Sequence, residues 1–545
     1  QKTFDGDTTT TWRAGNGGQR LTYDLGASSE FGGLRLDWAN DAQPDAYAVL
    51  ASDDGRNWRT LREVSGIDGG RDWIALPESE ARFLAIEIGD SGRTVALAEI
   101  GVEPLAFAAT PNDFIASVAK DLPRGRFPRG FSGEQTYWTI LGVDGGTEQG
   151  LIGEDGAVEV AKGGFSIEPF LFVDEALLGW ADVVAAQSLQ EGYLPIPSVD
   201  WMHADAALRV TAFVDSGSPD DDPPHSRIVA RYVLHNPGAI ARDYTLALAV
   251  QPFQVNPPSQ FLNTTGGVSR IASLAFEDGG VVRVNEQPRI YAQTPPDAAF
   301  ATAFDAGMAV SHLAAGRLPT TDAVVDPTGL ASGVMLYRWR LMPGESREVA
   351  LVVPMSGEPF RQGGPFSAEQ RQAIAAESWR TKLGAVTFSV PEEGHPLVDT
   401  LRTALAHQLI SRIGPRLQPG TRSYARSWIR DGAMISEGLL RMGREDAVLD
   451  YLDWYAPYQF DNGKVPCCVD DRGSDPVPEN DSHGELIFAI AEYARHTGDE
   501  TFLRRMWPHV RGAFDYMETL RTSERTEANR ARDPAFYGMM PASIS

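Results

Sequence analysis

Cysteine is almost absent from this sequence. The 545 residues include only two cysteines, which are adjacent at Cys467 and Cys468. Adjacent cysteines cannot join distant parts of a chain, so the sequence excludes a disulfide framework and does not identify the redox compartment. Three interpretations of the pair stay open: two ordinary loop thiols, a strained vicinal disulfide, or side chains on the rim of a ligand site.

Basic residues and long apolar runs are also scarce. There are 48 Lys and Arg residues against 74 Asp and Glu residues, which gives a formal net charge of −26. Long-range repulsion therefore opposes a polyanionic partner such as nucleic acid or an anionic membrane surface, whereas neutral ligands such as sugars escape this objection. No apolar run is long enough to cross a bilayer, so we expect no membrane insertion.

The remaining composition is that of a folded protein rich in turns. A hydrophobic fraction of 42% with 54 Gly and 36 Pro excludes collagen-like and disordered chains. The length predicts several domains. The chain begins with Gln1 and shows no basic-then-apolar signal segment. We therefore expect a processed or trimmed start, and we predict a secreted or periplasmic protein of bacterial type.

Residues 1–106 have the pattern of a small antiparallel β-sandwich, because short alternating runs are separated by clusters of Gly, Asp and Asn. Four of its pieces occur in the order expected of a discoidin domain. The segment therefore resembles the coagulation factor 5/8 C-type fold, which many carbohydrate-binding modules of secreted enzymes share. The pieces are residues 4–12 (FDGDTTTTW), 21–26 (LTYDLG), 52–58 (SDDGRNW) and 81–88 (ARFLAIEI).

The same segment contains a candidate calcium site. Asp5, Asp7, Thr10 and Glu99 offer hard oxygen ligands, and modules that the segment resembles often hold a structural Ca²⁺. The alternative is an Asx-type turn in which the aspartates bond to their own backbone. No other cofactor is expected.

Residues 107–366 show long alternating stretches, no repeat period and no cluster of catalytic residue types, so we predict a large two-sheet sandwich that acts as a scaffold. Residues 367–394 include a polar helical stretch, which we interpret as a linker helix. The predicted fold class is therefore multi-domain, with β-structure first and helices after it.

Residues 395–545 show helical periodicity. Five successive antiparallel helices are expected, bounded by Pro396, Gly414, Gly443 and Gly498. Their apolar faces carry Leu397, Leu401, Leu405, Leu409 and Ile413 in the first helix, Val448, Tyr451, Leu452 and Tyr455 in the third, Leu486, Ile487, Ile490 and Tyr493 in the fourth, and Leu503, Trp507, Val510, Phe514 and Met517 in the fifth.

Two polar clusters fall at the starts of the second and fourth helices. They are residues 423–434 (SYARSWIRDGAM) and 470–486 (DDRGSDPVPENDSHGEL). Helices that alternate in direction place these two starts at the same end of a bundle. The free N–H groups and the dipole at a helix start favour oxygen ligands and ionised carboxylates, so we expect one shared polar site.

The first cluster has the residue types that sugar recognition needs, an aromatic face and paired charges that grip vicinal hydroxyls. Tyr424, Trp428, Arg430 and Asp431 resemble the Tyr-x-x-x-Trp-x-Arg-Asp motif of six-hairpin glycosidases, which include glucoamylase-type and debranching-type glucosidases. The resemblance implies the first part of an (α/α)6 barrel in which Arg430 and Asp431 bind the sugar. The alternative is a buried ion pair that braces the start of a helix.

The second cluster continues into residues 479–499 (ENDSHGELIFAIAEYARHTGD), which resemble the same families. The resemblance implies that Asp481 faces the sugar, together with Glu479 and His483. Alternatively, Asp481 caps the helix and His483 makes only a local hydrogen bond. No metal ligand set is indicated here.

Hydrolysis of a glycosidic bond ordinarily needs two carboxylates. By resemblance, the acid and base of these families lie on later loops of the barrel, so we expect the natural protein to continue past Ser545; within the chain only Asp481 and Glu479 are catalytic candidates. The predicted function is a glycoside hydrolase that acts on an oligo- or polysaccharide, with inversion by resemblance. A phosphorylase or polysaccharide lyase on the same scaffold and a non-catalytic glycan-binding or adhesion protein are the alternatives.

Overall fold

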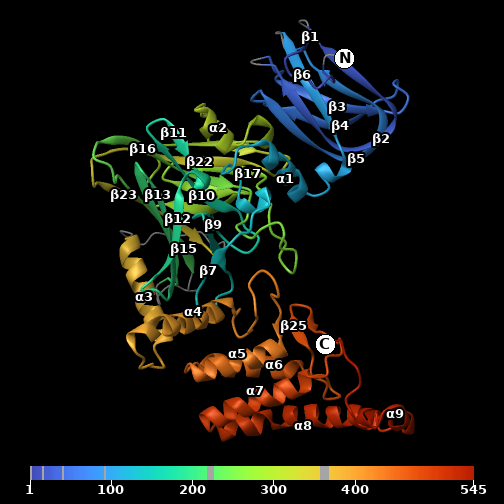
Figure 1. The fold of residues 1–545 in the computed structure, drawn as a ribbon, viewed down its shortest axis with the longest axis vertical. Helices are drawn as coiled ribbons and strands as arrows, with labels where there is room; N and C mark the ends of the chain where they lie inside the picture. The colour runs from blue at the N-terminus through green and yellow to red at the C-terminus, as the bar shows by residue number, and fades with distance from the viewer. Residues whose placement is uncertain are drawn as a thin grey trace.

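The computed structural model describes residues 3–14, 18–39, 42–90, 94–217, 226–355 and 367–544. Along its long axis a small β-unit is followed by a larger β-sandwich and then by helices (Figure 1). The predicted order of β-structure before helices is therefore confirmed. Residue 1, where the predicted N-terminal domain begins, and residue 366, where the predicted sandwich ends, lie outside the described residues. The other domain boundaries stay predictions.

The N-terminal unit is a six-stranded antiparallel sheet with the order β1-β6-β2-β5-β3-β4. Side chains alternate along it as the sequence predicts: Leu34, Leu36 and Trp38 are buried, whereas Arg35 and Asp37 between them are half-buried. The strands are β1 (Trp12–Ala14), β2 (Gln19–Trp38), β3 (Ala46–Ser52), β4 (Arg59–Ser65), β5 (Arg71–Ile88) and β6 (Val95–Glu103).

Asp72 on β5 makes the stability of this unit depend on pH. Its Oδ2 accepts hydrogen bonds from Trp38 Nε1 at 2.7 Å and Tyr47 Oη at 2.9 Å. Burial raises the pKa of Asp72 to about 7. The folded unit therefore binds a proton that the unfolded chain releases near pH 4, and its stability should fall as the pH rises from about 4 to about 7.

We expect Asp72→Asn, which keeps an acceptor oxygen without a charge, to remove this pH dependence. Calorimetric melting at about pH 5 and about pH 8 checks it: the variant should be stabilised relative to the native protein only at the higher pH. An equal difference at both values would contradict a titrating Asp72.

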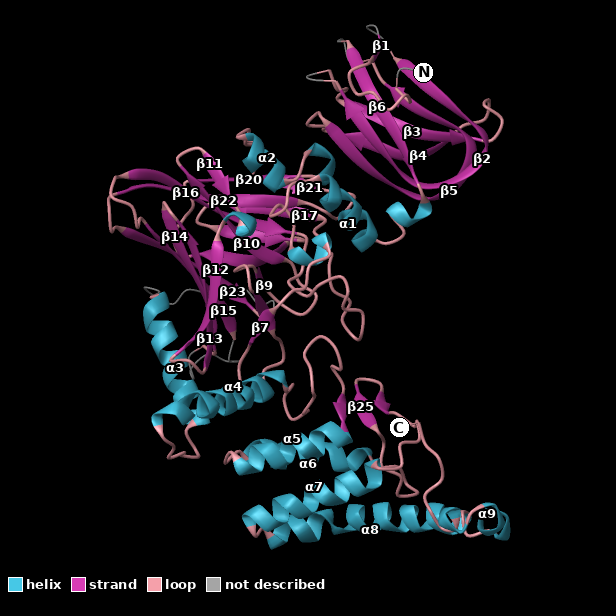
Figure 2. Cartoon of the chain, viewed as in Figure 1, coloured by secondary structure: helices cyan, strands magenta, loops and turns pink. Residues whose placement is uncertain are grey.

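The middle of the molecule is a sandwich of two large antiparallel sheets (Figure 2). Its core lies between them and includes Ile167 and Leu246 from one sheet and Val210 and Tyr232 from the other. The first sheet contains β7 (Trp138–Leu141), β8 (Gly150–Gly153), β9 (Val158–Glu159), β10 (Ser166–Val173), β11 (Ala176–Leu178), β16 (Arg242–Gln251), β20 (Ala298–Thr302) and β22 (Ser332–Leu341). The second contains β12 (Val184–Gln190), β13 (Leu194–His203), β14 (Ala206–Asp215), β15 (Arg227–His235), β17 (Ser273–Glu277), β18 (Val281–Val284), β19 (Gln287–Ala292), β21 (Ala323–Val325) and β23 (Ser346–Pro354).

Two helices in this part were not predicted, α1 (Pro111–Asp121) and α2 (Ala309–Ala315). The α1 helix begins with Thr110 as its N-cap, whose hydroxyl accepts from Asp113 N, and with Pro111 at the first position. Phe114 of α1 belongs to a separate aromatic cluster beside the N-terminal unit. An ion pair between Arg62 and Asp305, 2.6 Å apart, also joins the two parts.

The sandwich carries two helices on its outside, α3 (Ala368–Leu383) and α4 (His395–Ser411). The α3 helix agrees with the expected polar helical stretch and packs on β13 and β14. The α4 helix packs on β13 and β7. Of its predicted apolar stripe, Leu405 and Leu409 are buried, but Leu397 and Leu401 are exposed, so that part of the prediction is wrong.

The remaining helices are α5 (Ile429–Arg441), α6 (Glu445–Tyr455), α7 (Ser482–Thr497), α8 (Glu500–Ser523) and α9 (Glu527–Arg532). The α5, α6 and α7 helices pack on one another, and α7 packs on α8. Gly432 allows α5 and α6 to approach closely, because a Cβ there would lie 2.0 Å from the Tyr451 hydroxyl oxygen. The bundle confirms helices in the C-terminal part, while the (α/α)6 barrel stays a prediction.

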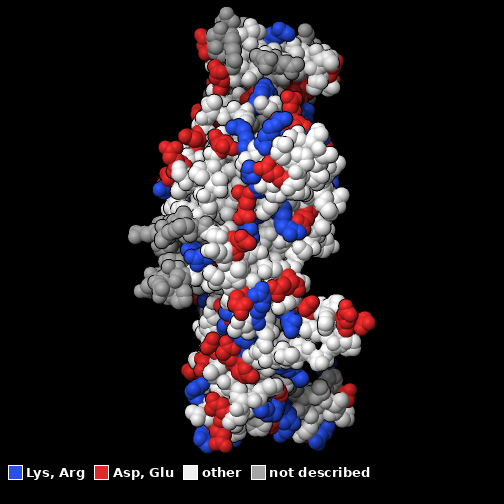
Figure 3. All heavy atoms as spheres, turned by 90° about the vertical axis from the view of Figure 1, so that its left-hand side faces the viewer, with Lys and Arg blue, Asp and Glu red and all other residues white. Residues whose placement is uncertain are grey.

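Within the described part of the chain, no helix combines the length and the apolar character needed to cross a membrane. On the face drawn in Figure 3, acidic side chains are interspersed with Lys and Arg over its length. The net charge of −26 is therefore not gathered into a single patch on that face.

Candidate functional site

The starts of α5 and α7 are joined by an arginine. Arg430, in the first turn of α5, donates from Nε to Asp481 Oδ2 at 2.5 Å and from Nη2 to Glu479 Oε2 at 3.1 Å. The side chains of Arg430 and Asp481 are each 38% exposed, and that of Glu479 is 10% exposed. The two sequence clusters therefore meet at one end of the bundle, at the protein surface.

A short strand fixes the approach to α5. Ser427 and Trp428 form β24, which pairs antiparallel with β25 (Cys468–Asp470), with Trp428 opposite Cys468. The Ile429 N–H then donates to Cys467 O at 3.0 Å as the helix begins. Because α5 starts directly after this strand, the strand sets the direction of both the Trp428 ring and the Arg430 side chain.

Two aromatic side chains precede Arg430 in the same segment. The ring centroids of Tyr424 and Trp428 are 6.4 Å apart with a 57° angle between the planes. Tyr424 is 56% exposed and has a φ of 51°, which is unusual for a non-glycine residue. The Arg426 guanidinium lies over the Trp428 ring, 5.3 Å from its centroid. The site thus combines apolar ring surface with charged hydrogen-bonding groups.

A loop of the sandwich contacts the same segment. Asn263 Oδ1 accepts from Ala425 N at 3.1 Å, and Thr264 N donates to Arg422 O at 3.1 Å. Phe261 in this loop is 74% exposed. This contact was not predicted, because the sandwich was expected to act only as a scaffold. The Asn and Gly residues around position 263 indicate a loop but not what the loop contacts.

A buried ion pair supports this junction. Arg422 donates to Glu159 Oε1 from Nη2 at 2.7 Å and from Nε at 3.0 Å, and their side chains are 1% and 0% exposed. Glu159 Oε2 also accepts from Asn256 N at 2.8 Å. One carboxylate therefore holds both the sandwich loop and the segment that carries Tyr424.

Asp431 and Glu485 are further carboxyl groups near Arg430. Asp431 lies in the first turn of α5, where the helix dipole favours a negative charge. Glu485 lies one turn into α7 and is half-buried; burial and the nearby Asp481 charge raise its pKa. Glu485 was missed by the sequence interpretation, although its i, i+4 spacing from Asp481 places both on one helix face.

His483 is buried in the bundle, so its expected role in sugar contact is corrected. It is 0% exposed, and its Nδ1 accepts from Val465 N at 3.1 Å. Burial lowers its pKa to about 4. The ring therefore packs inside the bundle as a neutral group. Asp481 occupies the N-cap position of α7 but accepts no capping hydrogen bond there; its carboxylate points to Arg430 instead.

Three of the four residues of the expected calcium site, Asp5, Asp7 and Thr10, are engaged within their own loop. Asp5 Oδ1 accepts from Asp7 N at 3.0 Å, and Asp5 Oδ2 accepts from the Thr10 hydroxyl at 3.0 Å. Asp7 Oδ1 accepts from Thr9, which lowers the pKa of Asp7. Glu99 Oε2 is buried without a hydrogen-bond partner among the described residues. These bonds are typical of an Asx turn, and calcium binding stays a prediction.

One family model matches the chain, the F5/8 type C domain over residues 1–100. This confirms the predicted discoidin-like domain at the N-terminus. The match leaves the sandwich and the helical part uncovered, so the six-hairpin glycosidase resemblance stays a prediction. No curated protein matches the chain.

Solved structures with similarity to the chain include carbohydrate-binding modules. Chitosan-binding module 1 of a chitosanase/glucanase from Paenibacillus sp. IK-5 is 27% identical, with 18% of this chain and 79% of that chain covered and a TM-score of 0.17. CpGH89CBM32-5 from Clostridium perfringens, in complex with GalNAc-β-1,3-galactose, is 24% identical over 18% and 78%, with a TM-score of 0.17. A Ruminococcus gnavus GH29 fucosidase is 25% identical; the match covers 19% of this chain but only 21% of the enzyme, with a TM-score of 0.18.

Proposed function

We propose that this chain is part of a secreted or periplasmic carbohydrate-active enzyme that hydrolyses glycosidic bonds, with inversion. In this proposal residues 395–545 form the first part of an (α/α)6 barrel, and the F5/8 type C domain binds glycan and keeps the enzyme near its substrate. The observation that carries the proposal is the Arg430 bridge between Asp481 and Glu479, at the end of a segment that also carries the neighbouring rings of Tyr424 and Trp428.

Each group has a role that follows from its chemistry. The Trp428 and Tyr424 rings pack against the C–H face of a sugar ring. Arg430 donates to sugar hydroxyls while the carboxylates of Asp481 and Asp431 accept from them, and charge-assisted hydrogen bonds of this kind are the stronger ones. Glu479, the least exposed of the group, holds the guanidinium in place.

Catalysis needs one carboxyl group that gives a proton and one carboxylate that activates water. Asp481 and Glu479 are the candidates from the sequence, but both are ion-paired to Arg430 and suit substrate binding. Glu485 has a raised pKa beside them, and a raised pKa is what a proton donor requires. We therefore add Glu485 to the catalytic candidates.

The F5/8 type C match favours a second candidate function, a glycan-binding or adhesion protein without catalysis. Incubation of the full-length protein with a broad glycan panel separates the two, with binding and release of reducing sugar measured in parallel. Release of reducing sugar supports the hydrolase. Binding without release would leave the adhesion function, and products that absorb in the ultraviolet or need phosphate would indicate a lyase or a phosphorylase.

A further inference from the structure

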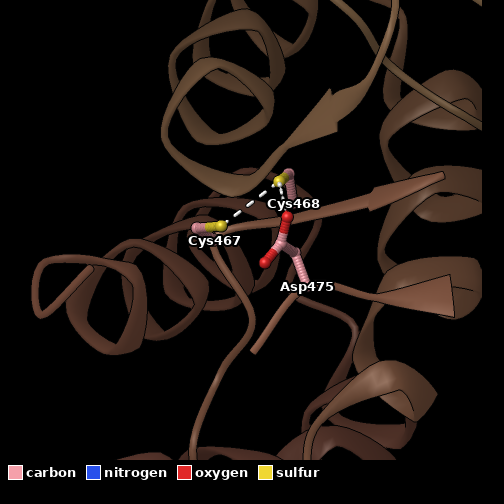
Figure 4. Close-up of side chains that lie close together, drawn as sticks. All are labelled: Cys467, Cys468 and Asp475. Carbon is pink, nitrogen blue, oxygen red and sulfur yellow. Dashed lines mark hydrogen bonds between the residues drawn. The ribbon is translucent and has the colours of Figure 1, made fainter. Parts of the chain in front are cut away.

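Next to β24, the short strand that ends with Trp428, three side chains of types that bind metal ions lie close together. One ligand atom each from Cys467, Cys468 and Asp475 lie within 4.8 Å of one another, and no other such group of His, Cys, Asp and Glu occurs among the residues with described positions. Figure 4 shows the two sulfurs side by side with the Asp475 carboxylate next to Cys468. The cysteines come from β25 and the residue before it, and Asp475 follows β26 (Gly473–Ser474).

The distances suit a tetrahedral ion. The two Sγ atoms are 3.2 Å apart as free thiols, and Cys468 Sγ lies 3.9 Å from Asp475 Oδ2. In a tetrahedral zinc site with Zn–S bonds of about 2.3 Å the sulfurs lie about 3.8 Å apart, so these sulfurs need to separate by only about 0.6 Å. Small side-chain rotations can supply that movement.

The charges around the group also fit a divalent cation. The Arg426 guanidinium donates to Asp475 Oδ2 at 2.9 Å. Two thiolates and one carboxylate would carry three negative charges, which a divalent cation and Arg426 balance. Buried structural cysteines usually have apolar surroundings, whereas these two, 3% and 0% exposed, lie beside a carboxylate and a guanidinium.

The backbone holds the three ligands in place. Asp475 N donates to Cys468 O at 3.0 Å, and Asp475 Oδ1 accepts from Val477 N at 3.0 Å. Cys468 is also paired in register with Trp428. Ligands that are fixed before binding lose little conformational freedom when an ion arrives.

We propose that Cys467, Cys468 and Asp475 form a binding site for a thiophilic divalent cation of the zinc and cadmium type. The two S–H bonds break, both protons pass to solvent, and two S–metal bonds form, with no change of oxidation state. The Asp475 carboxylate is the third ligand and a water completes the tetrahedron. The bound ion holds the start of β25 to the segment that follows β26, next to Trp428, which pairs with Cys468.

Titration of the chain with Cd²⁺ tests this site. The chain has only two cysteines, so a thiolate-to-cadmium charge-transfer band in the ultraviolet can arise from no other residue. We expect the band to saturate at one ion per chain and to disappear when Zn²⁺ replaces Cd²⁺. Asp475→Asn should weaken the binding at least about tenfold. A chain that shows no band at one equivalent of Cd²⁺ would overturn the proposal.

Asp470→Asn is the matched control, because it removes the other carboxylate that pairs with Arg426 and leaves all three ligands in place. It should bind Cd²⁺ as tightly as the native chain; equal weakening by both variants would show a general charge effect and refute the site. Should Asp475→Asn fail to fold by circular dichroism, the native chain still gives an answer. Zn²⁺ must then protect both thiols from a thiol reagent, and unprotected thiols would refute the site.

Discussion

Replacing Arg422 with leucine is expected to lower the free energy of unfolding by about 3–5 kcal/mol, because a buried charge loses its partner. Glu159 is 0% exposed and would keep backbone hydrogen bonds from Asn256 and Val255 but lose the charge that balances its own. Burial already raises the pKa of Glu159 and Arg422 opposes that rise. Without Arg422 the carboxyl group should take up a proton in the folded state.

The size of this loss should depend on pH. A folded-state pKa above the unfolded value of about 4.3 means that the folded variant binds more protons, so its stability falls as the pH rises through that window. Denaturant unfolding at several pH values measures this. The double variant Arg422→Leu with Glu159→Gln should recover part of the loss and show a weaker pH dependence.

Arg416→Leu serves as the control, since Arg416 pairs with Asp471, whose side chain is 88% exposed. An exposed ion pair contributes at most about 1 kcal/mol to stability, so the free energy of unfolding of this variant should stay close to that of the native chain. If both leucine variants lower the free energy of unfolding by the same amount, the buried pair does not hold the sandwich loop to the Tyr424 segment.

The sequence predicted the elements better than it predicted their buried faces. Alternation in β2 gave the inward positions of the N-terminal sheet, because one face of that sheet is buried. In α8 the predicted stripe was displaced by one residue: Trp507 and Phe514 are exposed, whereas Met506 and Ala513 are buried. Apolar residues occur on both sides of this helix, so periodicity alone cannot select the buried side.

Local signals were also available for elements that were missed. Thr110, Pro111 and Asp113 form a helix start that could have predicted α1, but the strong strand pattern of the surrounding residues outweighed it. The contact between Asn263 and Ala425 joins residues that are 162 positions apart. No local pattern encodes such a pairing, since it depends on how the sandwich and the helices pack together.

Some features of the candidate site could be predicted from the sequence and others could not. The proximity of Arg430 to Asp481 could be predicted, because both lie at the starts of helices that alternate in direction. The burial of His483 could not, since its position depends on the packing of α7 against the segment that contains Val465. Polar residues near a helix start therefore predicted where the site lies, but not which way each side chain points.

The second large effect is expected from Arg430→Lys. Lysine keeps a positive charge near Glu479 and Asp481, so the melting temperature should stay close to that of the native chain. It cannot reproduce the planar fork that donates to two groups at once. If Arg430 holds a sugar, affinity or kcat/KM should fall at least about a hundredfold, which corresponds to about 2.7 kcal/mol. Glycan binding by calorimetry and reducing-sugar release measure the two quantities.

Arg441→Lys provides the comparison on the same helix, since Arg441 is 67% exposed and pairs only with Glu437 one turn away in the hydrogen bonds of the described chain. It should leave binding, turnover and melting temperature unchanged. A large fall in melting temperature for Arg430→Lys with sugar affinity intact would mean that the pairs with Asp481 and Glu479 serve to join α5 to α7. Because the Arg430 side chain is 38% exposed, we expect the loss to appear in sugar affinity instead.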